Sequence, residues 1–395
     1  MKALAFGSCI LAGCLATSLL AGDTRSPTAG SVPWNAKTAA AYLDSRDTRS
    51  PTTGSVPWSA KAAAAYLDSR LAWWMSWPTA ARDHQTFCVS CHTVLPYAMA
   101  RPSLRADLAE QTPSQVESAL LENVTKRVRM WKEVQPYYEG GLNGVQSRGS
   151  ESVLNALILA GYDVASGVLS ADTRLAFENM WAQQLKEGAE KGSWSWQQFG
   201  LGPFEADAES QYYGATLAAI AVGIAPANYR STPEIQDGMK LLREYLLRDH
   251  TSRILLDRLM LLWASTKVPE LLTRTQQNSI IEAVLGKQQA DGGFSLSSFV
   301  GTWARSDGTP LETKSDGYAT GVVALVLQEA GLATDQPQLR RAIDGLAENQ
   351  GKDGRWFAYS VNKQRDLDSD RGQFMSDAAT AYAVLALERA GRGGS

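Results

Sequence analysis

The sequence predicts an all-α protein in which about six helical hairpins form an α/α toroid. From residue 60 onward, segments with a single apolar stripe alternate with segments that are small and apolar almost all round. A striped helix packs one face on a core, whereas a helix that is apolar all round must be buried on every side. Stacked pairs of the two kinds share one continuous core, as in repeat proteins. We therefore expect an inner ring of buried helices inside an outer ring of amphipathic ones.

Each ring is predicted from six segments. Residues 377–387, DAATAYAVLAL, exemplify the buried kind, since they have almost no polar face. The predicted inner helices are residues 91–100, 151–160, 208–222, 252–264, 316–328 and 377–387. In residues 275–288 the apolar side chains Ile280, Ile281 and Val284 fall on one stripe, which is typical of an outer helix. The predicted outer helices are residues 60–77, 113–134, 171–186, 233–247, 275–288 and 336–350.

Glycine-rich joints follow several outer segments. Residues 288–294 read QQADGGF, residues 350–356 read QGKDGRW, and residues 187–194 give a looser EGAEKGSW. Glycines end a helix, and an aromatic residue follows each time. This pattern resembles the Gln-x-x-x-Gly-x-Trp/Phe repeat of squalene–hopene cyclases and related prenyltransferase-type toroids, over roughly residues 60–390. The resemblance implies a central cavity that the N-termini of the inner helices face.

The chain departs from these cyclases at the acidic motif with which they protonate substrate. No Asp-rich motif of that kind begins an inner segment; the corresponding stretches are Ala-Glu-Ser at 208–210, Ser-Asp-Gly at 315–317 and Ser-Asp-Ala at 376–378. Small and acidic residues in such places are expected to be helix N-caps. The sequence therefore predicts the fold without the cyclase activity.

The clearest chemical motif is Cys-x-x-Cys-His at Cys88, Cys91 and His92. Two thiols at this spacing can add to the two vinyl groups of one haem, and the adjacent histidine then reaches the iron. These are the only cysteines outside the first 22 residues, and His92 is one of only three histidines in the chain. We therefore expect a covalent haem c with His92 as an iron ligand, at the start of the first inner helix and so at the mouth of the cavity.

The sequence also allows other functions for the same residues. Cys88 and Cys91 can form a disulfide around a very small loop, or a redox dithiol, although the βαβ pattern that usually accompanies such a dithiol is missing. Zinc is the sharper rival because prenyltransferase toroids hold a catalytic zinc. It needs three or four converging ligands, and Cys88, Cys91 and His92 are very close together for that role.

The sixth haem ligand is not fixed by the motif. Met375 precedes the last inner segment, which neighbours the first in a closed ring, and His84 lies four residues before Cys88. We favour Met375 over His84. His250 and Met99 are weaker candidates, with ordinary loop or packing roles. A methionine or a second histidine would favour electron transfer, and an open position would favour ligand or oxygen chemistry.

A run of acidic residues offers a second metal reading. Asp366, Asp368, Asp370 and Asp377 match positions 1, 3, 5 and 12 of a calcium-binding loop. Arg371 stands where such a loop needs glycine, so we expect a solvated loop.

The N-terminal region has two distinct parts. Residues 1–22 are apolar or small, with Lys2 as the sole charge, and predict a signal peptide for a periplasmic or secreted protein. LAGC at 11–14 resembles a lipobox, which would leave a lipid on Cys14, but the apolar run continues past Cys14 and favours ordinary cleavage near Ala21 or Gly22. Residues 23–46 and 47–70 are near-identical copies, so residues 23–59 are expected to be a peripheral or mobile duplicated segment; an arm that binds a partner is the alternative. The toroid is expected to occupy residues 60–395.

Composition narrows the function further. The 38 basic and 41 acidic residues nearly balance, so we expect no nucleic-acid partner, and no later segment is apolar enough to span a membrane. We expect an exported redox protein that transfers electrons to or from a partner protein. One alternative is haem-dependent oxidation of an apolar, isoprenoid-like molecule in an aromatic-lined cavity. The other is a non-catalytic binding toroid with a structural haem.

Overall fold

The computed structural model describes residues 58–200, 202 and 210–391, which belong to one compact unit. The signal peptide, Cys14 and the duplicated segment up to residue 57 lie outside these residues. The described chain contains twelve α-helices and a single short hairpin of strands β1 (Ala81–Arg82) and β2 (Thr86–Phe87). Within this part of the chain, no helix has both the length and the apolar character that crossing a bilayer requires. The expected all-α class is confirmed.

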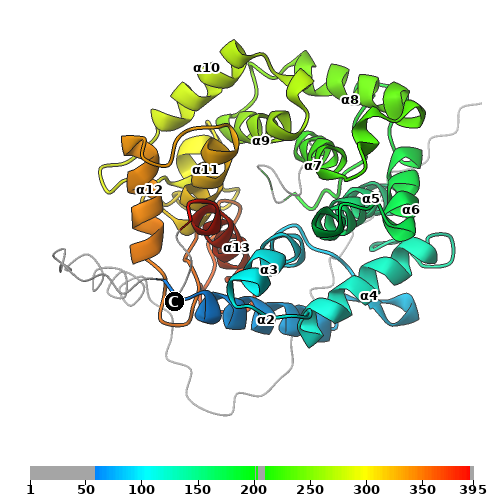
Figure 1. Ribbon diagram of the computed structural model, residues 1–395, viewed down its shortest axis with the longest axis horizontal. Helices are drawn as coiled ribbons and strands as arrows, with labels where there is room; N and C mark the ends of the chain where they lie inside the picture. Colours follow the sequence, from blue (N-terminus) through cyan, green and yellow to red (C-terminus); the bar gives the residue numbers. More distant parts are fainter. Residues whose placement is uncertain (1–57, 201, 203–209, 392–395) are drawn as a thin grey trace, which may run out of the picture. The chain divides into compact units, whose positions relative to one another are not determined.

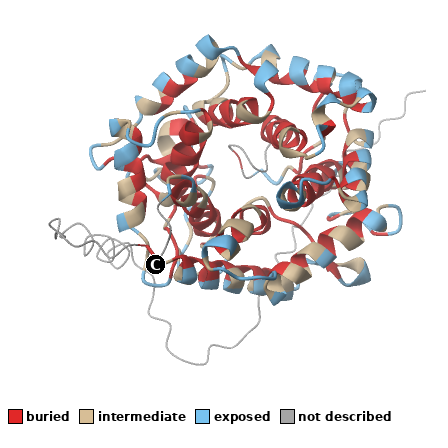
Figure 2. Cartoon of the chain, viewed as in Figure 1, coloured by how far each residue is buried: buried red, intermediate tan, exposed pale blue. Residues whose placement is uncertain are grey.

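Six helices form the inner ring (Figure 1). They are α3 (Val94–Asp107), α5 (Gly141–Asp163), α7 (Gln211–Ile224), α9 (Leu255–Lys267), α11 (Gly317–Glu329) and α13 (Phe374–Arg389). Each contacts the next in this order, and α13 also contacts α3, so the ring closes. Figure 2 shows these helices as mostly buried, which is why their sequences carry so few polar residues.

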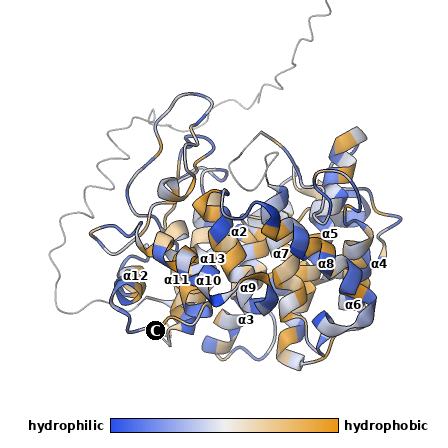
Figure 3. Cartoon of the chain, turned by 90° about the horizontal axis from the view of Figure 1, so that it is seen from above, coloured by the Kyte–Doolittle hydropathy of each residue, from blue (hydrophilic) through white to orange (hydrophobic). Residues whose placement is uncertain are grey.

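Six helices form the outer ring around them (Figure 1). They are α2 (Ala60–Ser76), α4 (Gln115–Arg129), α6 (Ala171–Ala182), α8 (Gln236–Arg248), α10 (Arg274–Leu285) and α12 (Pro337–Glu348). Each presents a buried stripe to the inner ring and an exposed face to solvent (Figure 2), as amphipathic helices do. Figure 3 shows hydrophobic residues gathered on the helices and hydrophilic ones along many loops. The α/α toroid of six helical hairpins is therefore confirmed.

Short 3-10 helices occupy several connections. They are η1 (Asp83–Gln85), η2 (Val164–Ser166), η3 (Tyr229–Ser231), η4 (Pro233–Ile235), η5 (Pro269–Leu271) and η6 (Leu296–Phe299).

Three glycine-rich joints each tie one outer helix to a following one. Gln350 Nε2 donates to Gly354 O at 2.9 Å within its own joint and to Ser59 O at 3.0 Å at the start of α2. Gln350 Oε1 accepts from Ser59 N at 2.6 Å, so this joint closes the outer ring. The aromatic residue of the joint is buried, and Trp356 Nε1 donates to Leu346 O at 2.8 Å, near the end of α12.

The prediction of N-caps is confirmed at one inner helix and is wrong at another. Asp316 caps α11, since its side chain accepts from Ala319 N at 2.8 Å. Ser210 occupies the N-cap position of α7 without a side-chain cap bond. Asp377 is not a cap: α13 begins three residues earlier at Phe374, which places Asp377 inside the helix, fully buried against α2 and α3.

Candidate functional site

The Cys88–His92 segment is a loop whose first residues are fixed by several contacts. The β1–β2 hairpin precedes it, and Cys88 N donates to Ala80 O at 2.9 Å. The amide of Asn123 on α4 clamps Phe87 by accepting from its N–H (2.8 Å) and donating to its carbonyl (3.1 Å). Trp74 Nε1 donates to Cys88 O at 2.7 Å. The loop geometry therefore depends on α2 and α4 as well as on its own sequence.

Ser90 sets where the first inner helix begins. Its Oγ accepts from Thr93 N and Val94 N, each at 3.2 Å, and so satisfies two N–H groups that the first turn of α3 leaves free. Cys91 and His92 therefore lie immediately before α3; the motif is at the start of the first inner helix as expected, although that helix begins at Val94 and not at residue 91.

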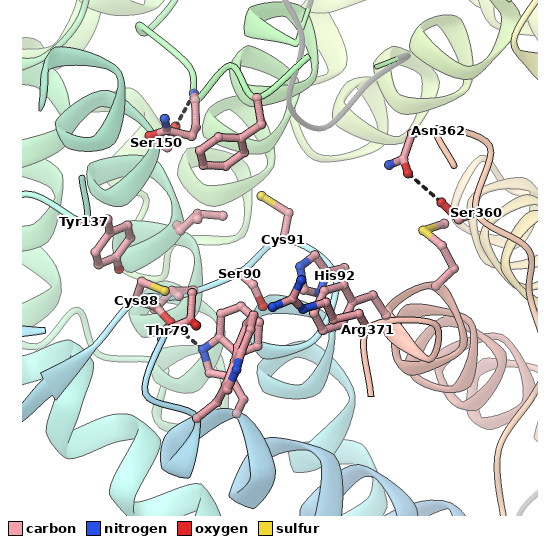
Figure 4. A pocket seen from close by; sticks show the side chains of 18 of the residues that line it. Thr79, Cys88, Ser90, Cys91, His92, Tyr137, Ser150, Ser360, Asn362 and Arg371 are labelled. Atoms are coloured by element: carbon pink, nitrogen blue, oxygen red, sulfur yellow. Dashed lines mark hydrogen bonds between the residues drawn. The ribbon is translucent and has the colours of Figure 1, made fainter. Parts of the chain in front are cut away.

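Cys88, Cys91 and His92 line one cavity of about 310 Å³, which lies in the range of small-molecule sites. In Figure 4 all three lie around one open space, which Tyr137 and Ser150 border on one side and Ser360 and Asn362 on the other. Much of the wall is aromatic. The aromatic lining residues are Trp74, Trp77, Tyr137, Tyr138, Trp196, Phe199 and Phe374, besides His92. The site is therefore an apolar pocket with two thiols and an imidazole on its wall.

The imidazole of His92 is held between aromatic rings. It stacks on Phe374 with ring centroids 3.9 Å apart and meets the edge of Trp74 at 5.3 Å. Burial, with the nearby guanidinium groups of Arg70 and Arg365, lowers the pKa of His92 to about 3. The ring is therefore neutral at ordinary pH, which is the form that binds metals.

A chain of hydrogen bonds fixes which ring nitrogen carries the proton. His92 Nδ1 lies 2.9 Å from Thr93 Oγ1, and Thr93 Oγ1 donates to Asp377 Oδ2 at 2.7 Å. Because the hydroxyl proton goes to the carboxylate, Thr93 Oγ1 can only accept from His92, so Nδ1 carries the hydrogen. The lone pair of the ring is then on Nε2, where an iron ligand needs it.

Asp377 is stabilised as a carboxylate by its donors. Arg70 Nε and the Tyr66 hydroxyl donate to Oδ1, each at 2.8 Å, while Thr93 occupies Oδ2. Burial raises the pKa of Asp377, and the charge of Arg70 together with these hydrogen bonds opposes that rise. Three donors on two oxygens, one of them a permanently charged guanidinium, are the surroundings of an ionised acid.

The two thiols differ in burial. Cys88 is buried, which raises the pKa of its thiol to about 11, and Cys91 is half-buried; no disulfide joins them. In the described part of the chain, no three His, Cys, Asp or Glu side chains converge as a metal cage would require. Separated thiols beside a histidine fit attachment along the edge of a macrocycle better than tetrahedral zinc.

Two arginines give the cavity positive charge. Arg365 and Arg371 both line it, and the Arg371 guanidinium lies 5.3 Å from the ring centroid of Trp77. Burial and the charge of Arg371 lower the pKa of Arg365. Among the described residues, neither guanidinium forms an ion pair with a carboxylate. Two cations in an apolar pocket fit an anionic ligand, and the two propionates of a haem have that charge.

The candidates for a sixth ligand are separated by the fold. Met375, on the first turn of α13, lines the cavity together with His92. His84 is not among the lining residues: its side chain is 43% exposed and lies 3.6 Å from Asp83. His250 bonds to Leu247 O at 2.9 Å, and Met99 packs against the core. The structure therefore brings only Met375 of these four to the cavity.

The acidic run does not gather into a calcium loop. Asp368 pairs with Arg355 and Asp370 with Arg70, while Asp377 is buried beside Thr93. Their carboxylates thus face different partners. Asp368 and Asp370 are exposed, as expected for a solvated loop, whereas Asp377 is buried inside α13, contrary to that expectation.

Several site residues were not predicted from the sequence. Phe374, Arg365, Arg371 and the Thr93–Asp377 pair come to His92 from the end of the chain, or act through a neighbour of the motif. The apolar pair Phe374–Met375 ahead of an all-apolar helix was the available signal that α13 begins early and reaches the cavity.

No family model matches the chain. Over 74 residues it is 38% identical to a squalene–hopene cyclase of Bradyrhizobium diazoefficiens, a match that covers 19% of this chain and 11% of the cyclase. A solved glycosidase in complex with glucose is 10% identical, with a TM-score of 0.35, and the match covers 91% of this chain and 100% of that one. A possible member of the GH105 family from Salmonella enterica is 12% identical, with a TM-score of 0.31 and coverage of 84% and 82%.

Proposed function

We propose that this protein is an exported redox protein that binds one c-type haem covalently through Cys88 and Cys91, with His92 as an iron ligand. The observation that carries the proposal is that these three residues line one apolar cavity that also holds two cations, Arg365 and Arg371. Bound there, a haem supplies a one-electron iron couple. The signal peptide expected at residues 1–22 fits the compartments in which such haems are attached.

Different residues of the cavity would hold different parts of the haem. The thiols of Cys88 and Cys91 would hold the group through thioethers, and Nε2 of His92 would be the iron-binding atom because Nδ1 is engaged by Thr93. The aromatic wall excludes water from the macrocycle, while the guanidinium groups of Arg365 and Arg371 neutralise carboxylates. Met375 is the candidate for the sixth position. With that position filled, the site transfers electrons to or from a partner protein.

Covalent attachment is tested by making the chain with c-type cytochrome maturation machinery and recording the spectrum of the denatured, reduced protein. We expect the wild type to keep its haem through denaturation, because thioether bonds survive unfolding. Cys88→Ser/Cys91→Ser should lose all covalent haem. His250→Gln, which changes a histidine away from the cavity, should keep it. A wild-type chain without covalent haem under these conditions would overturn the proposal.

A second function is favoured by the shape of the pocket. Its walls are largely aromatic, and aromatic cavities bind apolar molecules. If the sixth position is open, the cavity would hold an apolar, isoprenoid-like substrate beside the haem, whose iron would supply a site for dioxygen as the oxidant. The partial likeness to a squalene–hopene cyclase supports this class of substrate.

The native absorption spectrum separates the proposals. A low-spin, six-coordinate haem supports electron transfer. A high-spin, five-coordinate haem that binds carbon monoxide readily supports oxidation of an apolar substrate. A haem that reacts with neither carbon monoxide nor external reductants supports the third reading, a binding toroid in which the haem is structural.

A further inference from the structure

We infer that Asp377 is a positioning residue that acts through Thr93 to fix the tautomer of His92 and to strengthen its donation to iron. The inference rests on the proposed haem site and names what tunes it. It links the last inner helix, α13, to the motif that precedes the first, α3, through two hydrogen bonds.

The geometry assigns a donor and an acceptor to each of the two hydrogen bonds. The carboxylate of Asp377 takes the Thr93 hydroxyl proton at 2.7 Å, which leaves a Thr93 lone pair for His92 Nδ1–H at 2.9 Å. Negative charge on Asp377 is thereby passed to the imidazole through a polarised hydroxyl. Hydrogen-bond chains of this kind strengthen along their length in a low-dielectric interior.

Burial makes the arrangement rigid. Thr93 is 2% exposed and Asp377 is fully buried, so water does not compete for these bonds. Arg70 and Tyr66 hold Oδ1 and leave Oδ2 directed at Thr93. Oriented partners behind a metal-binding histidine set its ring orientation and basicity.

The same helix also holds the face of the ring. Phe374 lies one turn before Asp377 on α13 and stacks on His92 at 3.9 Å. The apolar contact fixes the plane of the imidazole, and the polar chain fixes its rotation and proton. Together they make α13 a support for the imidazole of His92, which lies just before α3.

Stronger electron donation from His92 favours oxidised over reduced iron. Loss of the hydrogen bonds that join Asp377, Thr93 and His92 should therefore raise the midpoint potential of the haem. We test this with Thr93→Val, which removes the hydroxyl but leaves Arg70 paired with Asp377, and with Thr93→Ser, which keeps the hydroxyl. In the haem-loaded protein, Thr93→Val should raise the ratio of reduced to oxidised protein at a fixed potential about tenfold, or about 59 mV for one electron. Thr93→Ser should stay near the wild type.

A second measurement needs no haem. Nitrogen NMR of the full-length chain labelled at histidine reports the proton position of each ring, and the chain has only three histidines. We expect His92 to hold its proton on Nδ1 in the wild type and in Thr93→Ser, and to populate both tautomers in Thr93→Val. Asp377→Asn, where it folds, should shift both measurements in the same direction as Thr93→Val.

The outcomes distinguish the two proposals. A wild-type potential and tautomer in Thr93→Val would overturn the positioning role while leaving the haem site intact. Failure of the wild type to take up haem would overturn the proposed function, and the tautomer measurement would still decide whether Asp377 and Thr93 fix the proton on Nδ1.

Discussion

At the scale of single residues, a buried ion pair lies where the ring closes. Asp377 and Arg70 form a buried pair between α13 and α2, and Asp370 adds a partly exposed carboxylate. Removing one member of such a pair is costly because the other is left buried without a counter-charge. The pair therefore specifies how the ends of the ring meet more than it adds net stability.

Glu388 at the end of α13 is a second acid in unfavourable surroundings. Partial burial and the nearby Asp107 raise its pKa to about 7. It is also close to the negative end of the helix dipole, which disfavours the carboxylate further. The folded chain therefore holds this proton between about pH 4.5 and 7, where the unfolded chain has released it, so stability falls as the pH rises through that window.

Glu388→Gln should remove this pH-dependent penalty. We expect no difference in unfolding free energy from the wild type at pH 4, where both side chains are neutral. At pH 8 we expect a gain of about 1 kcal/mol, a value reduced for the exposed part of the side chain. Urea unfolding at the two pH values measures it. Glu348→Gln, at the exposed end of α12, is the control, and an equal effect of Glu388→Gln at both pH values would contradict the explanation.

At the scale of elements, the joints show one pattern of bonding used three times. Gln288 Nε2 donates to Gly292 O at 2.8 Å and to Gln338 O at 2.7 Å, as Gln350 does to Gly354 and Ser59. Gln184 makes the same pair of bonds, to Gly192 O at 3.0 Å and Gly238 O at 2.9 Å. Each glutamine thus ties the end of one outer helix to the start of a following one.

The sequence pattern revealed two of these joints fully and the third only in part. Gln288 and Gln350 lie four residues before their glycines, whereas Gln184 lies eight before Gly192. Spacing alone therefore identified the glycine and the tryptophan of the third joint but missed Gln184. Gln184 makes the same hydrogen bonds despite its longer loop, because these bonds depend on the position of the glycine carbonyl relative to the glutamine and not on the number of residues between them.

Gly354 is the position where a joint tolerates least change. Its φ is +89°, and an added Cβ would collide with the backbone of Ala62 on α2. Gly354→Ala should lower the unfolding free energy by about 3 kcal/mol through strain and steric overlap. Gly345→Ala, in α12 with open space around the added atom, should instead raise it by about 0.5 to 1 kcal/mol. Thermal and urea unfolding measure both, and equal effects would show that contact with α2 is unimportant.

At the scale of the whole molecule, the two rings could be predicted because the pattern of apolar residues in each helix shows how much of its surface must be buried. An all-apolar segment such as α11 must be internal wherever it lies in the chain, and a striped one such as α12 must face outward on one side. The site could be predicted only in part. Cys88, Cys91 and His92 are adjacent in the sequence, whereas Asp377 reaches Thr93 from 284 residues away, which no local pattern records.

The outer ring closes on the second of the two N-terminal copies. Ser59 bonds to Gln350, and the ring centroid of Trp58 lies 5.8 Å from that of Trp356. Deleting residues 23–46 leaves this copy complete, so we expect the melting temperature and the haem content to stay unchanged. Deleting residues 23–70 removes Ser59 and Arg70 and should abolish cooperative unfolding. Calorimetry of both deletions tests this, and a destabilised 23–46 deletion would show that the first copy is not redundant.

The contact between α3 and α13 also imposes an order on assembly. Synthesis runs from the N-terminus, so the Cys-x-x-Cys-His loop emerges long before the helix that carries Phe374 and Asp377. Bringing these segments together closes a very long loop, which is slow in folding because entropy must be lost first. Until α13 docks, one wall of the cavity is missing and the two thiols remain accessible. On the proposed function, haem attachment therefore competes in time with the last step of folding. If α13 docks before the haem is attached, the folded protein would lack its cofactor.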